Sequence, residues 1–265
     1  MPSLPRTSHR SATPTLIRLT PGEQLRAGRL PQRLVRLMVG LTLYGTAMAM
    51  MVRAGLGLDP WDVLHIGIAD RTGLSMGTVV IVVGFAVLLL WIPLRQWPGL
   101  GTVANAVWIG IATDVGLRLI GEPDPLWARI LLMIAAVVVN AVGGALYIGS
   151  QLGPGPRDGL MTGLHARTGL SLRLVRTSLE LTVLAAGWLL GGVVGVGTVL
   201  YAVLIGPLVQ LFLPWCTVRL DPERVRGVRS AGGGPLVDAG DDPGEDVGIS
   251  ARQHAVPQVE DVTGS

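Results

Sequence analysis

The ionisable residues that recur along the chain are the first candidates for chemistry. Asp62 and Arg71 lie in one loop, and Asp158 and Arg167 lie in a second loop with the same separation between acid and base. A carboxylate and a guanidinium can pair with each other or bind opposite charges on a solute. We therefore regard these four side chains as candidate substrate-binding or gating residues.

These residues belong to an internal repeat with a constant offset of 96 residues. Residues 57–76 align without gaps to residues 153–172, and ten of the twenty positions are identical. At the same offset, residues 99–110 match residues 195–206 at eight of twelve positions. Such self-similarity indicates a duplication, in which each half contains one apolar span, a motif loop and two further spans.

Each motif loop has the pattern of a short helix with both ends marked, and we predict these helices over 60–71 and 156–167. A proline opens each helix, where its missing N–H is harmless, and a glycine closes it, where a left-handed residue is favoured. The aspartates then oppose the positive end of the helix dipole, and the arginines oppose the negative end. These local roles are an alternative to ligand binding, and the sequence leaves both open.

A helix of this length cannot cross a bilayer, because about 12 residues rise only about 18 Å. It must lie at the membrane surface or dip inward. If both helices dip inward, they bring paired acids and bases to a central cavity, as broken helices do in transporters.

The two motif loops also diverge in their polar residues. Asp59, Trp61, His65 and Asp70 of the first copy are replaced in the second copy by Gly155, Arg157, Met161 and Ala166. His65 is a further candidate because a histidine can titrate near neutral pH. Any cavity between the loops is therefore expected to be chemically asymmetric.

The composition places the middle of the chain in a membrane. Of the 265 residues, 49% are hydrophobic and 15% are charged, and the mean hydropathy is +0.53. Six apolar segments approach the roughly 20 residues that a spanning helix needs. We predict spans at about 34–53, 75–94, 100–118, 129–149, 174–193 and 197–215.

The two ends of the chain differ from this apolar middle. Residues 1–33 are rich in Pro, Ser, Thr and Arg, and residues 219–265 are rich in Gly, Asp, Glu and Pro. Such segments bury too little apolar surface to offset their chain entropy. We predict two disordered tails there, the first of them basic, and two membrane repeats over 34–122 and 123–218.

The arginines predict the orientation of the spans. With a cytoplasmic N-terminus, 17 arginines fall on the cytoplasmic side and four fall outside, as the positive-inside rule favours. Both termini are then cytoplasmic. Because each half has an odd number of spans, the second half starts on the opposite side of the membrane. The predicted fold is an all-α protein of six transmembrane helices arranged as two inverted three-helix repeats.

Ionisable residues within spans are costly and are functional candidates by default. Asp114 and Glu180 are the two predicted here, as possible groups for ion coupling. Arg118 lies four residues after Asp114, and Arg176 lies four residues before Glu180. Each acid can therefore form an ion pair within its own helix instead.

Several other chemistries are disfavoured by the residues present. Cys216 is the single cysteine, and the four histidines have no metal-binding spacing, so we expect no metal site and no cofactor. The sequence contains no grouping of nucleophile and base, so we do not expect an enzyme. We also expect no nucleic-acid partner.

The motifs resemble a known family. The segments AGLGLDPWDVLH (54–65), RTGLS (71–75), WPGLGT (97–102) and GPGPRDG (153–159) are similar to those of the YczE/YyaS/YitT family of bacterial integral membrane proteins, especially its YczE branch. The resemblance covers about residues 34–218. It implies a protein of the bacterial cytoplasmic membrane, but it supplies no substrate and no site residues.

Two functions remain open from the sequence. The inverted repeat favours a transporter or permease for a small solute, working by alternating access with the lipid bilayer as its surroundings. The alternative is a membrane scaffold or accessory protein that binds a cytoplasmic partner through its tails.

Overall fold

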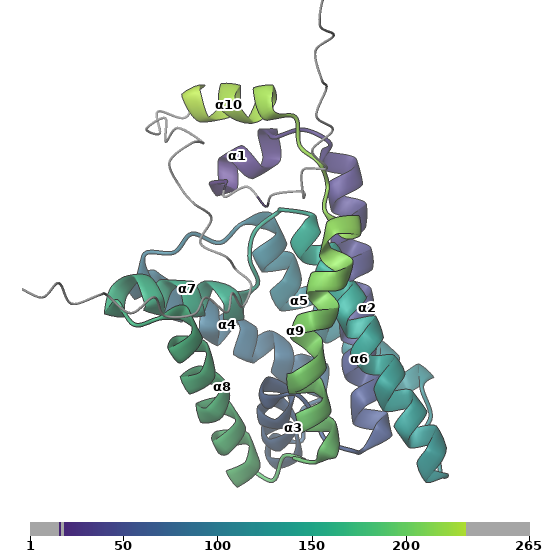
Figure 1. Ribbon diagram of the computed structural model, residues 1–265. Helices are drawn as coiled ribbons and strands as arrows, with labels where there is room; N and C mark the ends of the chain where they lie inside the picture. The colour runs from purple at the N-terminus through teal and green to yellow at the C-terminus, as the bar shows by residue number, and fades with distance from the viewer. Residues whose placement is uncertain (1–15, 17–18, 232–265) are drawn as a thin grey trace, which may run out of the picture.

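The structure, a computed structural model, describes residue 16 and residues 19–231, and in these residues it contains ten α-helices and no strand (Figure 1). The all-α prediction is thus confirmed for this part of the chain. The helices are α1 (Pro21–Arg26), α2 (Leu30–Ala54), α3 (Pro60–Thr72), α4 (Met76–Leu94), α5 (Leu100–Leu119), α6 (Leu126–Gly149), α7 (Pro156–Thr168), α8 (Leu172–Leu189), α9 (Val196–Cys216) and α10 (Pro222–Ala231).

Five of the described helices are long and apolar enough to cross a membrane, namely α2, α4, α5, α6 and α9. Large apolar side chains such as Leu89, Ile92 and Val203 are exposed on them, which suits contact with lipid. We predicted six spans. The predicted span at about 174–193 corresponds to α8, which is not among these five helices. It has 18 residues and carries three charged side chains, which are Arg173, Arg176 and Glu180.

Two short helices occupy segments that we predicted to be irregular. α1 lies in the predicted N-terminal tail, and α10 lies in the predicted C-terminal tail. Val225 of α10 forms a small apolar cluster with Ala27 and Val218, and this packing gives both segments a buried surface that their composition did not reveal. The remaining residues of the predicted tails, 1–15, 17–18 and 232–265, lie outside the described residues.

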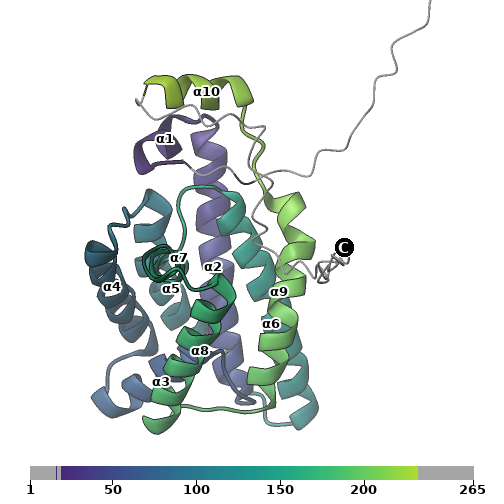
Figure 2. The same cartoon turned by 60° about the vertical axis from the view of Figure 1, so that its left-hand side comes forward.

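The helices define two ends of the molecule. We call the end that carries α1 and α10 the termini end, because both ends of the described chain lie there in contact with each other (Figures 1 and 2). The opposite end is called the far end. α3 lies toward the far end beside α8, whereas α7 lies closer to the termini end (Figure 2).

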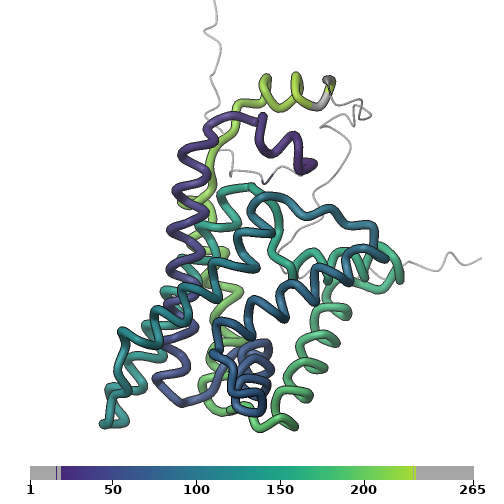
Figure 3. The backbone as a smooth tube through the Cα atoms, turned by 180° about the vertical axis from the view of Figure 1, so that it is seen from behind, coloured from purple at the N-terminus to yellow at the C-terminus, as the bar shows by residue number. Residues whose placement is uncertain are grey.

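The first helices of the two halves, α2 and α6, cross each other closely near the middle of the molecule (Figure 3). A Cβ atom added to Gly143 of α6 would lie 2.8 Å from the carbonyl oxygen of Gly40 and 2.8 Å from the amide nitrogen of Tyr44. Small residues allow membrane helices to approach this closely. The crossing therefore depends on glycine at this position.

Each short helix packs against a long helix of the other half. α3 contacts α8, where a Cβ atom on Gly187 would overlap the backbone of Leu64. α7 contacts α4, where the indole of Trp91 fills the space beside Gly159 and its Nε1 donates a hydrogen bond to the carbonyl of Pro156 at 3.0 Å. Trp91 and Gly187 are 96 residues apart, so the two contacts use equivalent positions.

The loops that lead into the short helices also contact the other half of the chain. The amide of Gly101 in α5 donates to the carbonyl of Leu152 at 2.7 Å, and the amide of Gly197 in α9 donates to the carbonyl of Leu56 at 2.8 Å. Both donors and both acceptors are separated by 96 residues. Each loop is therefore anchored to the start of a long helix from the other half.

The glycines of α6 provide a matched test of the α2–α6 crossing. We expect Gly143→Ala to destabilise the protein by about 1–3 kcal/mol, because the new methyl group overlaps the backbone of α2. We expect Gly144→Ala to be neutral or stabilising by up to about 1 kcal/mol, because its Cβ atom would lie 3.7 Å from the Val209 side chain, an ordinary contact distance. Thermal unfolding of both variants in detergent measures the difference, and equal melting temperatures would contradict the crossing.

Candidate functional site

The short helices α3 and α7 meet at their N-termini in the interior of the molecule. The guanidinium carbon of Arg157 in α7 lies 5.0 Å from the ring centre of Trp61 in α3, and these two residues occupy equivalent repeat positions. Arg157 also places one nitrogen 3.8 Å from Oδ1 of Asp59 and another 3.8 Å from Oδ1 of Asp62. We call Asp59, Asp62, His65 and Arg157 the central polar cluster.

Local sequence explains how α3 positions its three members of the cluster. Asp59 caps the helix, because its Oδ1 accepts hydrogen bonds from the amides of Trp61 at 2.8 Å and Asp62 at 2.9 Å. Pro60 starts the helix at the position that tolerates a missing N–H. One turn later, Nδ1 of His65 lies 3.1 Å from Oδ1 of Asp62.

The cluster is buried but only partly satisfied. Asp59, Asp62 and His65 are each at most 2% exposed, whereas the side chain of Arg157 is 24% exposed. Among the described residues, Oδ2 of Asp59 and Oδ2 of Asp62 have no hydrogen-bond partner. Buried polar atoms are normally paired, so two free carboxylate oxygens at one place indicate a site with capacity for a ligand.

Burial dominates the electrostatics of the α3 residues, which lie outside the five spanning helices. Loss of hydration raises the pKa of the Asp59 and Asp62 carboxyls to about 6, with the Asp62 charge adding to the rise at Asp59 and Arg157 opposing the rise at both. Loss of hydration also lowers the pKa of His65 to about 3. His65 is therefore neutral, and it can donate a hydrogen bond to Asp62.

Tyrosines from three spanning helices lie near Arg157 or its neighbour Asp158. Tyr44 of α2 and Tyr201 of α9 lie near Arg157, and the Tyr201 hydroxyl donates to Oδ1 of Asn140 at 3.2 Å. The Tyr147 hydroxyl of α6 donates to Oδ2 of Asp158 at 2.5 Å. The site thus combines carboxylates, one guanidinium and aromatic hydroxyls.

The structure brings together only some of the candidates from the sequence. Asp62 and His65 belong to the cluster, and Asp158 adjoins it through Tyr147 as an exposed side chain. Asp62 lies near Arg157, which was not among the candidate site residues from the sequence. Arg71 instead donates to a carbonyl at the end of α8. Asp59 and Arg157 could have been found as charged residues that occur in only one copy of the duplicated motif.

Arg71 and Arg167 bind the ends of long helices from the other half. Arg71 donates from Nε to the carbonyl of Leu190 at 3.0 Å and from a terminal nitrogen to that of Leu189 at 3.1 Å, at the end of α8. Arg167 donates to the carbonyl of Pro93, near the end of α4. Leu189 and Pro93 are 96 residues apart, so the repeated arginines make equivalent contacts.

A second pair of arginines has the same role and was missed in the sequence. Arg33 of α2 donates from Nε to the carbonyl of Ser150 at 2.8 Å, and Arg129 of α6 donates from Nε to the carbonyl of Ala54 at 2.7 Å. The two arginines are 96 residues apart, as are the two acceptors. The sequence alignment of the two halves begins at residue 57. Arg33 and its equivalent Arg129 lie outside the aligned segments, so the alignment did not reveal them.

The two acids predicted within spans have separate partners. Asp114 of α5 accepts from the Ser75 hydroxyl at 2.6 Å and from the amide of Gly77 at 2.8 Å, and it thereby joins α5 to the start of α4. Glu180 of α8 pairs with Nε of Arg176 at 3.0 Å, which is the ion pair that the sequence offered as the alternative.

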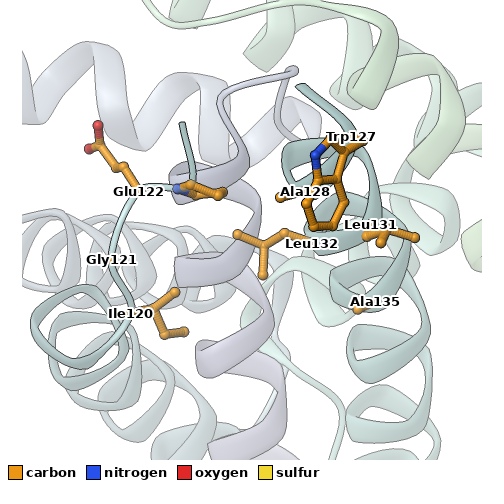
Figure 4. Close-up of a pocket in the computed structure, with 9 residues that line it drawn as sticks. Ile120, Gly121, Glu122, Trp127, Ala128, Leu131, Leu132 and Ala135 are labelled. Carbon is orange, nitrogen blue, oxygen red and sulfur yellow. The ribbon is translucent and has the colours of Figure 1, made fainter. Parts of the chain in front are cut away.

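Two surface cavities are formed by other residues. One, of about 580 Å³, lies where the α5–α6 connection meets the first turns of α6 (Figure 4). It is lined by Ile120, Gly121, Glu122, Pro123, Trp127, Ala128, Leu131, Leu132 and Ala135. The other, of about 350 Å³, lies between α4 and α7 and includes Arg167. Neither includes a member of the central polar cluster.

The side chains of the site can be compared with the ligands that a metal ion needs. In residues 16 and 19–231, no group of three or more His, Cys, Asp or Glu side chains could hold a metal ion. The cluster offers charge and hydrogen bonds to a ligand instead.

The arginines at the helix ends can be tested against an exposed control. We expect Arg71→Gln and Arg167→Gln each to lower stability by about 0.5–1.5 kcal/mol, because each removes a charged donor from a backbone carbonyl at a helix end. Arg118→Gln, at an exposed position near the end of α5, should change stability by less than about 0.5 kcal/mol. Thermal unfolding in detergent compares the three, and an equal effect at all three positions would contradict the capping role.

Comparisons with known proteins agree with these features. The model of a family described as "Family of unknown function (DUF6198)" matches residues 31–214. An "Uncharacterized protein" of Haemophilus influenzae is 41% identical over 177 residues, covering 67% of this chain and 81% of that protein. "Uncharacterized membrane protein YczE" of Bacillus subtilis is 34% identical over 178 residues, covering 66% of this chain and 79% of that protein.

"Uncharacterized protein YyaS" of Bacillus subtilis is 23% identical over 180 residues, covering 66% of this chain and 90% of that protein. No solved structure matches the chain. The family resemblance seen in the motifs is confirmed, and the five apolar helices agree with a multi-pass membrane protein. The chain belongs to the family of unknown function DUF6198, and it is a relative of the membrane protein YczE and of YyaS.

Proposed function

We propose that this protein carries a small solute across the bacterial cytoplasmic membrane by alternating access, with the central polar cluster as its binding site. The observation that carries the proposal is a buried cluster with free carboxylate oxygens, located where two short helices from different halves of a duplicated chain meet. Discontinuous helices that meet at a polar site are a recurrent architecture of secondary transporters. In this proposal the protein has no enzymatic activity.

The proposal requires α8 to be a sixth crossing. α1 and α10 contact each other at the termini end, and a chain that starts and ends on one side must cross the membrane an even number of times. Five apolar helices supply an odd number. α8 supports this proposal because it extends from α7 toward the far end and connects there to α9 (Figure 1). Its Arg176–Glu180 pair reduces the cost of charge in that crossing.

The halves are then inverted repeats related by an axis in the membrane plane. The equivalent contacts described above support this relation, because they occur at opposite ends of the molecule. α2 starts toward the termini end and finishes toward the far end, and α6 runs the opposite way (Figure 1). Arg33 is in the first turn of α2 and Ser150 follows the last residue of α6, whereas Arg129 is in the first turn of α6 and Ala54 is the last residue of α2.

One half is closed in this structure. α4 packs along α5, where a Cβ atom on Gly110 would lie 2.6 Å from Ile81, and Asp114 holds Ser75 and Gly77. These contacts lie toward the far end, because α4 starts there. We propose that they form the closed gate on the outside.

The other half is open at the equivalent place. α8 does not pack along α9 as α4 packs along α5. Arg173 and Gln210 replace Gly77 and Asp114 at the offset of 96, and a Cβ atom on Gly206 would have no neighbour within 4 Å. The bulk of an arginine removes the close crossing that glycine permits. We propose that this open flank gives access to the cluster from the cytoplasm.

The positive-inside rule supports this assignment of sides. The far end carries four arginines, Arg53, Arg71, Arg118 and Arg129. The 17 other arginines of the sequence fall on the opposite side in the predicted topology, so we propose that both termini are cytoplasmic. In the transport cycle, α8 closes onto α9 as α4 separates from α5, and the cluster changes sides.

Cysteine labelling tests this cycle without knowledge of the solute. In a Cys216→Ser background, which lacks any other cysteine, single cysteines are placed at Ile81 in α4 and Thr177 in α8. These residues are equivalent in the repeat. We expect a charged, membrane-impermeant thiol reagent to label Thr177→Cys in inside-out vesicles and Ile81→Cys in right-side-out vesicles.

A static scaffold predicts a different labelling pattern. Ile81→Cys would be protected from the reagent in both kinds of vesicle, because Ile81 stays packed on Gly110. Protection of Ile81→Cys from both sides, with Thr177→Cys labelled, would therefore overturn the carrier and favour the scaffold. Leu89→Cys, on the exposed apolar surface of α4, controls for reagent that enters the bilayer.

A further inference from the structure

The central polar cluster carries more negative than positive charge. Two buried carboxylates, Asp59 and Asp62, face one guanidinium, Arg157, at 3.8 Å from each. Burial and its surrounding charges keep His65 neutral, so it supplies no second positive charge. An uncompensated charge inside a membrane protein is expensive, and such a cluster must therefore acquire one positive charge.

The hydrogen bonds of the cluster leave a defined place for that charge. Oδ1 of Asp59 is used by the amides of the α3 N-terminus, and Oδ1 of Asp62 faces His65. The helix dipole and the histidine thus act on the Oδ1 atoms. Oδ2 of each carboxylate is buried and has no partner among the described residues.

We propose that the Asp59–Asp62 pair binds one exchangeable proton on a free Oδ2 atom. Binding forms one O–H bond and reduces the negative charge of the cluster by one, and nothing is oxidised or reduced. The inference deepens the proposed function, because it names the coupling ligand of the same site. In the carrier, the solute would move together with this proton or in exchange for it.

Only the first copy of the motif is built for this proton. Gly155 stands in the second copy where Asp59 stands in the first, and Met161 stands where His65 stands. Asp158, the equivalent of Asp62, is exposed and bound by Tyr147. The duplication thus supplies two similar short helices, and the proton site belongs to α3 alone.

The groups around the pair favour a proton over a metal cation. Arg157 and Asp158 of α7, Tyr44 of α2, Tyr147 of α6 and Tyr201 of α9 face the cluster or its edge. Arg176 of α8 interacts with Asp158 and pairs with Glu180. The guanidinium lies beside both carboxylates, where it repels a metal ion. A metal ion also needs several converging oxygen ligands, whereas a proton needs only one oxygen.

The site is poised to exchange its proton within the ordinary range of cellular pH. Burial brings both carboxyls to a pKa of about 6. Arg157, which lies 3.8 Å from both carboxylates, is partly exposed, and the cluster is therefore in reach of water.

Proton uptake by the purified full-length chain in detergent tests the proposal. The protein is taken from about pH 8 to about pH 5, and the number of protons that it binds is measured by titration. The same titration is carried out on the Asn variants, and the infrared band of a protonated carboxyl is recorded for each protein. We expect Asp59→Asn and Asp62→Asn each to lose one proton of uptake with a midpoint near pH 6. The remaining carboxylate is then balanced by Arg157 and stays ionised.

Two further variants make the result specific. Asp70→Asn, an exposed position on the same helix, should retain the full uptake near pH 6. Arg157→Gln should shift the uptake to higher pH and increase it, because both carboxylates then lack a counter-charge. If Asp62→Asn fails to fold, Asp59→Asn and Arg157→Gln still decide the question.

The outcomes distinguish a bound proton from a bound metal cation. Unchanged uptake in both Asn variants would overturn the proposal, as would a midpoint that moves when sodium chloride replaces choline chloride, since that would indicate a metal cation. Loss of uptake in the Asn variants alone would support it. Uptake in detergent does not require transport, so this experiment and the cysteine labelling can fail independently.

Discussion

Backbone groups at helix ends cannot be satisfied by lipid, and this constraint governs how the two halves are joined. The short helices α3 and α7 begin inside the protein, and the long helices α8 and α4 end beside the last turns of α3 and α7. Arg33 and Arg129 donate to the carbonyls at the ends of α6 and α2, and Arg71 and Arg167 do the same for α8 and α4. Every one of these donors serves the other half. The duplicated chain is therefore held together by reciprocal capping as well as by the close glycine crossing of α2 and α6.

The central polar cluster depends on these contacts between the two halves. Because each short helix packs on a helix of the other half, both N-termini are directed to one interior place, where Trp61 and Arg157 meet. Residues at equivalent positions then face each other across the junction. Differences between the copies therefore determine the charges at this point. An arginine from one copy lies beside two carboxylates from the other. Duplication without divergence would have placed identical residues there and left no basis for an asymmetric site.

The same divergence accounts for the different packing of α4 on α5 and of α8 beside α9. Gly77, Gly110 and Asp114 allow α4 to pack along α5, whereas α8 carries Arg173 at the position of Gly77 and stays apart from α9. A small residue permits backbone contact, and a long charged residue prevents it. One flank is therefore closed and the other open although the halves share their pattern. This asymmetry is what the proposed carrier cycle depends on, because that cycle requires two flanks that differ in packing.

Local structure could be predicted from the amino-acid sequence. Pro60, Asp62 and Gly73 mark a helix observed over Pro60–Thr72, and the six spans predicted from hydropathy include the five long apolar helices. These features depend on near neighbours and on composition, which one sequence contains. It could not reveal the apolar cluster that orders α1 and α10, or that Arg157 rather than Arg71 lies beside Asp62. Those contacts join residues that are far apart in the chain, and only the packing of one half against the other decides which side chains meet.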